Sequence, residues 1–224
     1  MEFEEWEPIY ERLLQDFGYD RGADCRARDV LSRYVTPFDT GRLSVAGNTV
    51  AIAGGSPSLA DELEAVEAAD FVIAASTAGD VLLEAGVSFD LLVTDLDKTP
   101  ETAIDMSHTG IPVAVHAHGD NVNMIRRHLP KFDSENVLGT TQAAPVHPVQ
   151  NFGGFTDGDR SAFIADHFGA GSLVFPGWDL EDTSVSKNKQ RKLSWAERLL
   201  FLLEERREER FDILDSRRER LRSL

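Results

Sequence analysis

Short apolar runs alternate with segments of helical periodicity through the middle of the chain. The runs cover residues 49–53, 71–75, 91–94, 112–115, 137–141 and 172–175, and none contains a charged residue. Uniformly apolar strands separated by helices are typical of a parallel sheet that is buried on both faces. The pattern therefore predicts an α/β fold with a mainly parallel sheet flanked by helices.

Both ends of the chain have helical periodicity instead. Apolar residues recur at i, i+3 and i+4 spacing from Trp6 to Phe17, and a second helix is expected over residues 23–34. We therefore predict an N-terminal helical cap at residues 1–40, an α/β catalytic core at 41–193 and a long C-terminal helix from 194 to 224. The last helix is either solvated or a homo-oligomer contact through Phe211, Ile213 and Leu214.

Composition narrows the class of partner. The 224 residues carry a formal net charge of −16, and only five of the 23 basic residues are lysine. Such a surface repels nucleic acid and anionic lipid and stays soluble in concentrated salt, so we expect neither partner and a halophilic origin. The alternative to a halophilic origin is an ordinary acidic cytosolic protein. No apolar run has the length of a membrane span and the acidic start is unlike a signal peptide, which favours the cytoplasm. The single cysteine, Cys25, cannot form an internal disulfide.

The first polar cluster follows the run at 49–53. Gly54 and Gly55 allow the backbone to approach a ligand, and the helix start after Ser56 and Ser58 offers N–H groups to a phosphate. The cluster lacks the third glycine of a dinucleotide fingerprint and the Gly-Lys of a Walker loop. A tight turn with Ser58 as helix cap is the alternative.

The next two clusters follow the runs at 91–94 and 112–115. Asp95 and Asp97 are spaced to share one side of the chain, so we expect them to bind a hard cation; Asp97 as a helix cap is the alternative. In the third cluster, alternate residues share a face, which pairs His116 with His118. With Asp120 and Asn121 it resembles the zinc motif of metallo-β-lactamase-like hydrolases, but Asn121 stands where that motif has histidine. We therefore expect these residues to contact a ribose, a phosphate or an acceptor.

Two further clusters lie near the C-terminal third. Asp157, Asp159 and Arg160 collect at the expected start of a helix, where Asp159 as N-cap would explain one of the three. Four cations then occur within six residues of a chain that otherwise avoids lysine, which favours phosphate contacts over a solvated face. They are Lys187, Lys189, Arg191 and Lys192.

Taken in order, these clusters resemble the archaeal 6-hydroxymethyl-7,8-dihydropterin pyrophosphokinase family, MptE-like, which is related in fold to thiamine pyrophosphokinases. The matching segments are Gly-Gly-Ser-Pro-Ser-Leu (54–59), Val-Thr-Asp-Leu-Asp (93–97), His-Ala-His-Gly-Asp-Asn (116–121), Gly-Phe-Thr-Asp-Gly-Asp-Arg (154–160) and Lys-Leu (192–193). The chain departs from the family at Ser76 and Thr77, where Asp-Gly is usual, and at Lys98, where glycine is common.

The resemblance implies transfer of diphosphate from ATP to the hydroxymethyl group of a pterin, with AMP as second product, in the biosynthesis of a tetrahydrofolate- or methanopterin-type cofactor. It implies Mg²⁺ on Asp95 and Asp97, with Asp120 or Asp157 as further candidates, charge neutralisation by Lys189 and Lys192, and Asp120 as the candidate general base. Two alternatives remain open. Residues 95–99 resemble the Asp-x-Asp-x-Thr signature of haloacid-dehalogenase-like phosphatases, and a non-catalytic nucleotide-binding protein is also compatible with the pattern.

Overall fold

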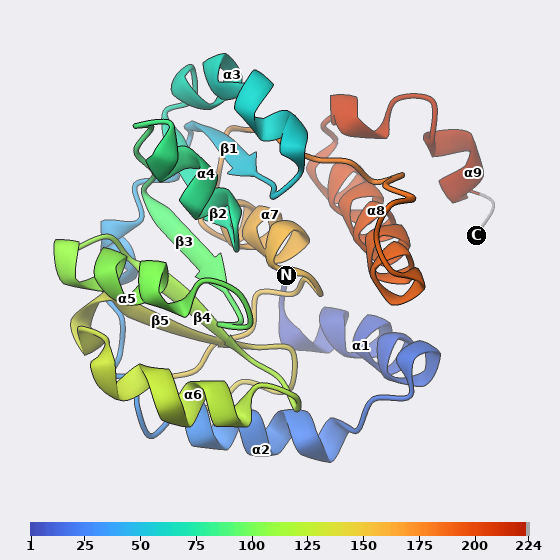
Figure 1. The fold of residues 1–224 in the computed structure, drawn as a ribbon. Helices are drawn as coiled ribbons and strands as arrows, with labels where there is room; N and C mark the ends of the chain where they lie inside the picture. The colour runs from blue at the N-terminus through green and yellow to red at the C-terminus, as the bar shows by residue number, and fades with distance from the viewer. Residues whose placement is uncertain (223–224) are drawn as a thin grey trace. The chain divides into compact units, whose positions relative to one another are not determined.

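The computed structural model describes residues 1–222, which form two compact units, each built from two separate segments of the chain. The first unit comprises Met1–Leu43 and Phe89–Gly153, and the second comprises Ser44–Ser88 and the described residues from Gly154 onward. Figure 1 shows the course of the chain and the labels of the elements. Every strand pairing within either unit is parallel.

The first unit contains three parallel strands covered by helices. Its strands lie in the order β5-β4-β3. In chain order its elements are α1 (Phe3–Phe17), α2 (Arg21–Leu31), η1 (Thr40–Arg42), β3 (Leu91–Thr94), α5 (Pro100–Thr109), β4 (Val113–Ala117), α6 (Val122–His128), η3 (Leu129–Lys131), η4 (Ser134–Asn136) and β5 (Val137–Thr141). Helix α2 packs against β4, β5 and α6, and α5 packs against β3 and β4 (Figure 1).

The second unit also contains three parallel strands, in the order β2-β1-β6. Its elements are β1 (Thr49–Ala53), η2 (Pro57–Asp61), α3 (Leu63–Glu67), β2 (Phe71–Ala75), α4 (Ala78–Glu84), α7 (Asp157–His167), β6 (Ser172–Val174), α8 (Lys187–Arg207), η5 (Asp212–Leu214) and α9 (Arg218–Arg222). Helix α7 packs against β1, β2 and α8. The α/β class predicted from the apolar runs is confirmed.

The strands form where the runs of branched and small apolar residues lie. All residues of β2, β3, β4 and β5 are buried, as expected for strands covered on both faces. The N-terminal helix buries Trp6, Tyr10, Leu13 and Leu14 on one face, which is the periodicity that predicted it. Within the residues that the model describes, no helix combines the length and apolar character needed to cross a membrane.

The boundaries of two helices differ from prediction. Helix α2 begins at Arg21 because Asp20 caps it, its carboxylate accepting the N–H of Gly22, and it ends at Leu31 rather than 34. Helix α8 begins at Lys187, well before residue 194, with Ser186 as its cap. It ends at Arg207, where Glu208 follows in a left-handed conformation, rather than continuing towards residue 224. The early start was missed because residues 187–192 are polar and contribute nothing to the apolar stripe.

The C-terminal segment folds back on α8. Phe211 and Leu214 are buried within the second unit, and the Phe211 ring lies 4.9 Å from that of Phe175. Glu204 on α8 accepts hydrogen bonds from Nε and Nη2 of Arg218, each at 2.7 Å, and from the N–H of Phe211 at 2.8 Å. Two of the three residues expected at a dimer contact are therefore packed inside their own chain.

Candidate active site

In the first unit, Asp95 and His118 come together at the carboxyl ends of adjacent strands. Thr94 of β3 pairs with Val115 of β4, so the residues that follow the two strands leave the sheet side by side. His118 Nε2 lies 3.4 Å from Asp95 Oδ2. The N–H of Asp120 points at His118 Nδ1 over 3.4 Å, and the other ring nitrogen, Nε2, faces Asp95.

The Asp95 carboxylate is only partly accessible and strongly acidic. Its side chain is 22% exposed. Burial by itself raises the pKa of Asp95, but hydrogen bonds to His118 and Asp97 outweigh this effect and hold the pKa well below its ordinary value. Its Oδ1 accepts the N–H of Asp97 at 3.1 Å, and Asp97 itself is exposed. The strand end therefore presents a persistent negative charge.

The residue between the two aspartates has an unusual backbone. Leu96 has a φ of 67° and is completely buried, with its N–H donated to Thr94 Oγ1 at 3.0 Å. The left-handed conformation costs a residue with a Cβ about 1–2 kcal/mol. Such strain is found preferentially at functional sites, where the surrounding structure enforces it.

Asn121 and His116 are buried behind this pair. The Asn121 amide donates to the carbonyl oxygens of Asp95 (2.9 Å) and His116 (2.6 Å). Its Oδ1 accepts the N–H of His118 at 3.0 Å. The side chain of Asn121 thus ties the loop after β3 to the loop after β4. His116 Nδ1 contacts Thr140 Oγ1 at 3.1 Å, and its ring stacks on His118 with centroids 6.1 Å apart. These contacts favour a role for Asn121 and His116 in holding His118 and Asp95 in place.

In the second unit, the glycine loop after β1 is held by the segment that follows β6. The N–H of Gly54 donates to Pro176 O and the N–H of Ser56 donates to Gly177 O, each at 2.9 Å. These two donors therefore serve the protein backbone rather than a phosphate. Ser56, not Ser58, caps the short helix that follows, and its Oγ accepts the N–H of Ser58 at 3.4 Å.

Trp178 contacts this loop and was not predicted. Its indole Nε1 donates to Ile52 O at 2.8 Å. A Cβ added to Gly54 would lie 2.7 Å from Trp178 Cδ1, and one added to Gly158 would lie 2.6 Å from its Cη2. The indole thus fills the space between the loop and the start of α7, which explains why both motifs contain glycine. No sequence spacing indicates this contact, because Trp178 lies in an irregular segment 124 residues after Gly54.

The start of α7 is a capping box. Thr156 is the N-cap, and Asp159, expected as a possible N-cap, occupies the third helical position. The Asp159 carboxylate is fully buried and accepts the N–H groups of Phe155 and Thr156 and the hydroxyl of Thr156. Burial raises the pKa of Asp159, and these donors oppose that rise. The geometry favours a structural role for Asp159.

Arg160 and Asp157 form the other part of this turn. Arg160 is 2% exposed and donates to Asp157 Oδ1 and to Phe155 O, each at 2.9 Å. The Asp157 side chain is 13% exposed. Of the predicted acids in this motif, Asp157 is therefore the more accessible to a substrate.

The cluster of cations lies in the first two turns of α8. Positive side chains are unfavourable at a helix N-terminus because they oppose the helix dipole, so these cations do not serve to stabilise the start of α8. Lys192 Nζ lies 5.8 Å from the centre of the Phe155 ring, close to the start of α7. Lys189 is exposed. Both predicted phosphate contacts remain predictions.

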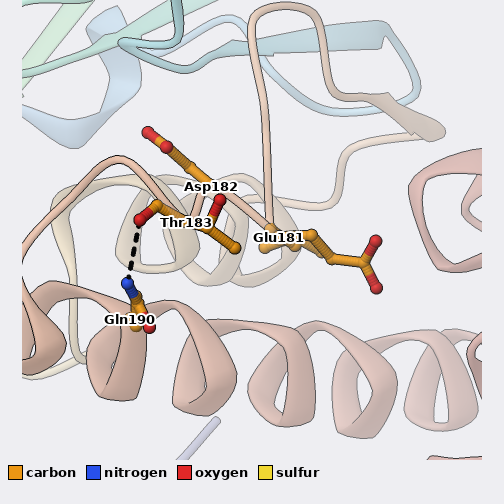
Figure 2. Close-up of a pocket in the computed structure, with 5 residues that line it drawn as sticks. Glu181, Asp182, Thr183 and Gln190 are labelled. Carbon is orange, nitrogen blue, oxygen red and sulfur yellow. Dashed lines mark hydrogen bonds between the residues drawn. The ribbon is translucent and has the colours of Figure 1, made fainter.

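A separate pocket lies beside the cation cluster, where the loop before α8 meets the helix. It is lined by Leu180, Glu181, Asp182, Thr183 and Gln190, and Figure 2 shows Gln190 bonded to this loop. Gln190 Nε2 donates to Thr183 O at 3.2 Å and to Val185 O at 3.0 Å. The carboxylates of Glu181 and Asp182 in the lining of this pocket disfavour the binding of a phosphate, and none of the predicted site residues lines the pocket.

Across the described residues, no group of three or more histidine, cysteine, aspartate and glutamate side chains is arranged to hold a metal ion. The predicted site residues are divided between the two units. The first unit holds Asp95, Asp97, His116, His118, Asp120 and Asn121. The second holds Gly54, Gly55, Ser56, Ser58, Asp157, Asp159, Arg160, Lys189 and Lys192.

Parallel strands with polar clusters beyond their carboxyl ends define a ligand-binding protein of the α/β class. Within that class the chain belongs to the MptE-like family. The protein-family model described as "6-hydroxymethylpterin diphosphokinase MptE-like" matches residues 30–185 of the chain. The resemblance found in the sequence motifs is thereby confirmed.

Three curated relatives are similar over most of their length, and each is named 6-hydroxymethyl-7,8-dihydropterin pyrophosphokinase. The protein from Methanothermobacter thermautotrophicus is 38% identical, over 91% of this chain and 96% of the relative. The protein from Pyrococcus furiosus is 36% identical, over 89% and 93%. The protein from Methanocaldococcus jannaschii is 32% identical, over 94% and 99%.

Proposed function

We propose that this protein transfers the diphosphate group of ATP to the hydroxymethyl group of 6-hydroxymethyl-7,8-dihydropterin and releases AMP. The observation that carries the proposal is the similarity, over about nine-tenths of the chain, to relatives that bear this name. The acidic cluster at the ends of β3 and β4 supports it. The names of these relatives do not favour the phosphatase or the non-catalytic alternative.

In the proposed reaction, the hydroxymethyl oxygen of the pterin attacks the β-phosphorus of ATP. A new O–P bond forms, the bond from that phosphorus to the oxygen bridging the α-phosphate breaks, and AMP leaves with the bridging oxygen. The hydroxyl proton passes to a base, for which Asp120 is the candidate because it is exposed beside His118. Such transfers depend mainly on positioning and charge neutralisation.

Asp95 and Asp97 are the candidate ligands for Mg²⁺. Two carboxylates fit this ion, because Mg²⁺ takes oxygen ligands and is usually held by one or two carboxylates, with water and substrate phosphates completing its shell. When bound, Mg²⁺ would neutralise phosphate charge. The protein's own part is to hold Asp95 ionised, which the contacts with His118 and Asp97 favour.

Lys189 and Lys192 are the candidates for neutralising the remaining phosphate charge, since both lie at the N-terminus of α8. Asp157 is a second candidate for proton transfer or metal binding, because its side chain retains some exposure next to Arg160. We further propose that the protein acts in the cytoplasm and in the biosynthesis of a pterin cofactor.

The reaction is tested by incubating the purified protein with ATP, Mg²⁺ and 6-hydroxymethyl-7,8-dihydropterin. AMP and pterin diphosphate should appear in equal amounts. Stoichiometric ADP, or free phosphate without pterin diphosphate, would contradict the proposed reaction.

The metal assignment is tested with Asp95→Asn and Asp97→Asn across a magnesium titration. Each should lower turnover by about 10²-fold or more, and part of the loss should be recovered at high Mg²⁺ because a weakened site refills by mass action. Asp105→Asn, an exposed change on α5, is the matched control. A phosphoenzyme on Asp95, or full activity in both site variants, would argue for the phosphatase alternative or against the metal site.

A further inference from the structure

Asp24 on α2 is a buried carboxylate that the proposed reaction does not use. It is 3% exposed and accepts three hydrogen bonds, each at 2.7 Å. Tyr10 Oη and Gln142 Nε2 donate to its Oδ2, and the backbone N–H of Gly119 donates to its Oδ1. One side chain therefore joins α2 to α1, to the loop after β4 and to the loop after β5.

The side chains that donate to Asp24 are themselves fixed. Tyr10 is completely buried, and burial together with the contact to Asp24 raises its pKa far above the ordinary value, so it remains a phenol donor. The backbone carbonyl of Gln142 accepts a hydrogen bond from Trp6 Nε1 at 2.9 Å, and Trp6 is also completely buried. A carboxylate with this many short, buried contacts has little freedom to move.

Gly119 rests directly on α2. A Cβ added to Gly119 would lie 2.6 Å from the Cβ of Ala23, the residue before Asp24. Real side-chain atoms do not approach so closely, so the loop is in van der Waals contact with the helix and any larger residue would push it away. This contact is independent of the hydrogen bond from Gly119 to Asp24.

The loop so held contains His118 and Asp120, which flank Gly119. From the sheet side, Asn121 bonds the same loop through the N–H of His118 and ties it to Asp95. The segment is thus clamped between Asn121 and Asp24. Its position decides where the His118 imidazole meets the Asp95 carboxylate.

We propose that Asp24 is a positioning residue of the diphosphate transfer, acting on His118 and Asp120 through the N–H of Gly119. This inference rests on the proposed function and adds a residue to it. Asp24 is 3% exposed and accepts its three hydrogen bonds from protein donors, so it acts through the loop rather than on the substrate. A displacement of about 1 Å in a group that positions a substrate can cost about 10²-fold in rate, so loss of this anchor is expected to act on kcat.

The first experiment separates positioning from a general loss of stability. Asp24→Ala removes the acceptor for Gly119 and should lower kcat by about 10- to 100-fold with KM for ATP changed by less than about threefold. Asp24→Asn retains Oδ1 for Gly119 and should keep kcat within about threefold of wild type. Tyr10→Phe removes a different donor from the same carboxylate and is the matched control: its melting temperature should fall while kcat stays within about threefold.

The second experiment displaces the loop without touching Asp24. Gly119→Ala introduces the Cβ that would meet Ala23, and it should reduce kcat as Asp24→Ala does. Adding Ala23→Gly removes the opposing Cβ, so the double variant should recover most of the activity. Ala23→Gly alone should remain active.

Hydrogen exchange provides a readout that does not depend on turnover. In Asp24→Ala and in Gly119→Ala, amide exchange over residues 118–121 should rise at least about tenfold, while exchange in β4 stays unchanged. If the wild-type protein makes no AMP, the proposed reaction fails but this readout still decides whether Asp24 anchors the loop. Unchanged exchange, an active Asp24→Ala, or a kcat that falls in Tyr10→Phe in proportion to its melting temperature would each overturn the inference.

Discussion

A methyl group at Gly54 should destabilise the protein far more than one at Gly55, although the two glycines are neighbours in the same loop. A Cβ added to Gly54 would lie 2.5 Å from Gly177 O and 2.7 Å from Trp178 Cδ1. The first of these is a backbone atom that also accepts the N–H of Ser56, so it cannot move without disturbing the loop. A Cβ added to Gly55 would meet only the hydroxyl of Thr77, at 2.6 Å, with its next neighbour 3.9 Å away.

The expected cost follows from the contacts that must give way. Gly54→Ala lengthens the hydrogen bonds of Gly54 to Pro176 and of Ser56 to Gly177 and displaces the indole that bonds to Ile52. At about 1 kcal/mol for each of three hydrogen bonds, less about 0.4–1 kcal/mol for the reduced entropy of the unfolded chain, the net loss is about 2 kcal/mol. In a chain of this size that corresponds to a fall in melting temperature of about 4–8 °C.

Scanning calorimetry of Gly54→Ala, Gly55→Ala and the double variant Gly55→Ala/Thr77→Ala measures the difference. In Gly55→Ala the Thr77 hydroxyl can rotate away, so its melting temperature should lie within about 2 °C of wild type, and the double variant should show no deficit. Equal destabilisation by the two single changes, or a Gly54→Ala protein that melts with the wild type, would refute the argument that Trp178 and Gly177 hold this loop.

Three further predictions concern stability and salt. Glu204→Gln should cost about 2 kcal/mol, since it removes the carboxylate that accepts two hydrogen bonds from the largely buried guanidinium of Arg218, which keeps its ion pair with Asp215. Burial raises the pKa of Glu204, but hydrogen bonds from Arg218 and Phe211 outweigh this effect and lower the pKa below its ordinary value of 4.5. The ionised Glu204 therefore stabilises the fold above that value, and this stabilisation is lost as the pH falls through the lower pKa of the folded state. Urea titrations at a series of pH values should accordingly show a steeper loss of stability at acid pH in the wild type than in the variant. Asp159→Asn should lower stability by about 1–3 kcal/mol while leaving KM for ATP unchanged, and a raised KM with unchanged stability would instead indicate a substrate contact. Thermal midpoints should rise from dilute buffer to molar KCl because salt screens the repulsion within a chain of net charge −16, and a flat or falling curve would count against a halophilic origin.

Much of the fold could be predicted because the strands are chemically distinct from their surroundings. Strands β1, β2, β3 and β5 begin and end where the apolar runs begin and end. The start of α8 could not be found in the same way, since Lys187 to Lys192 carry no apolar periodicity and the cap at Ser186 is a single hydroxyl. The pattern of apolar residues locates elements that bury a regular face, but it does not locate the start of a helix whose first residues are exposed to solvent.

The residues of the candidate site also differ in how far the sequence could predict them. The chemistry-bearing residues Asp95 and His118 could be predicted because both follow apolar runs, and parallel topology brings such positions to one edge. Asp24 and Trp178 could not. Their partners lie 95 residues away at Gly119 and 124 away at Gly54, and nothing in the intervening sequence encodes the contact. Residues that hold a site in place are set by tertiary packing, so they become visible only in the structure.

The interleaving of the two units has a consequence for synthesis on the ribosome. Strand β1 is the central strand of its unit, between β2 and β6, yet β6 begins at Ser172, which is translated roughly 120 residues after Ala53. Because translation proceeds at about 5–20 residues per second, the edge of β1 that pairs with β6 stays unpaired for on the order of ten seconds after β1 is synthesised. During that interval the nascent chain exposes a row of unpaired N–H and C=O groups on an apolar strand, the kind of edge that recruits other strands. Correct assembly of this protein therefore depends on keeping that edge covered until the last third of the chain has emerged.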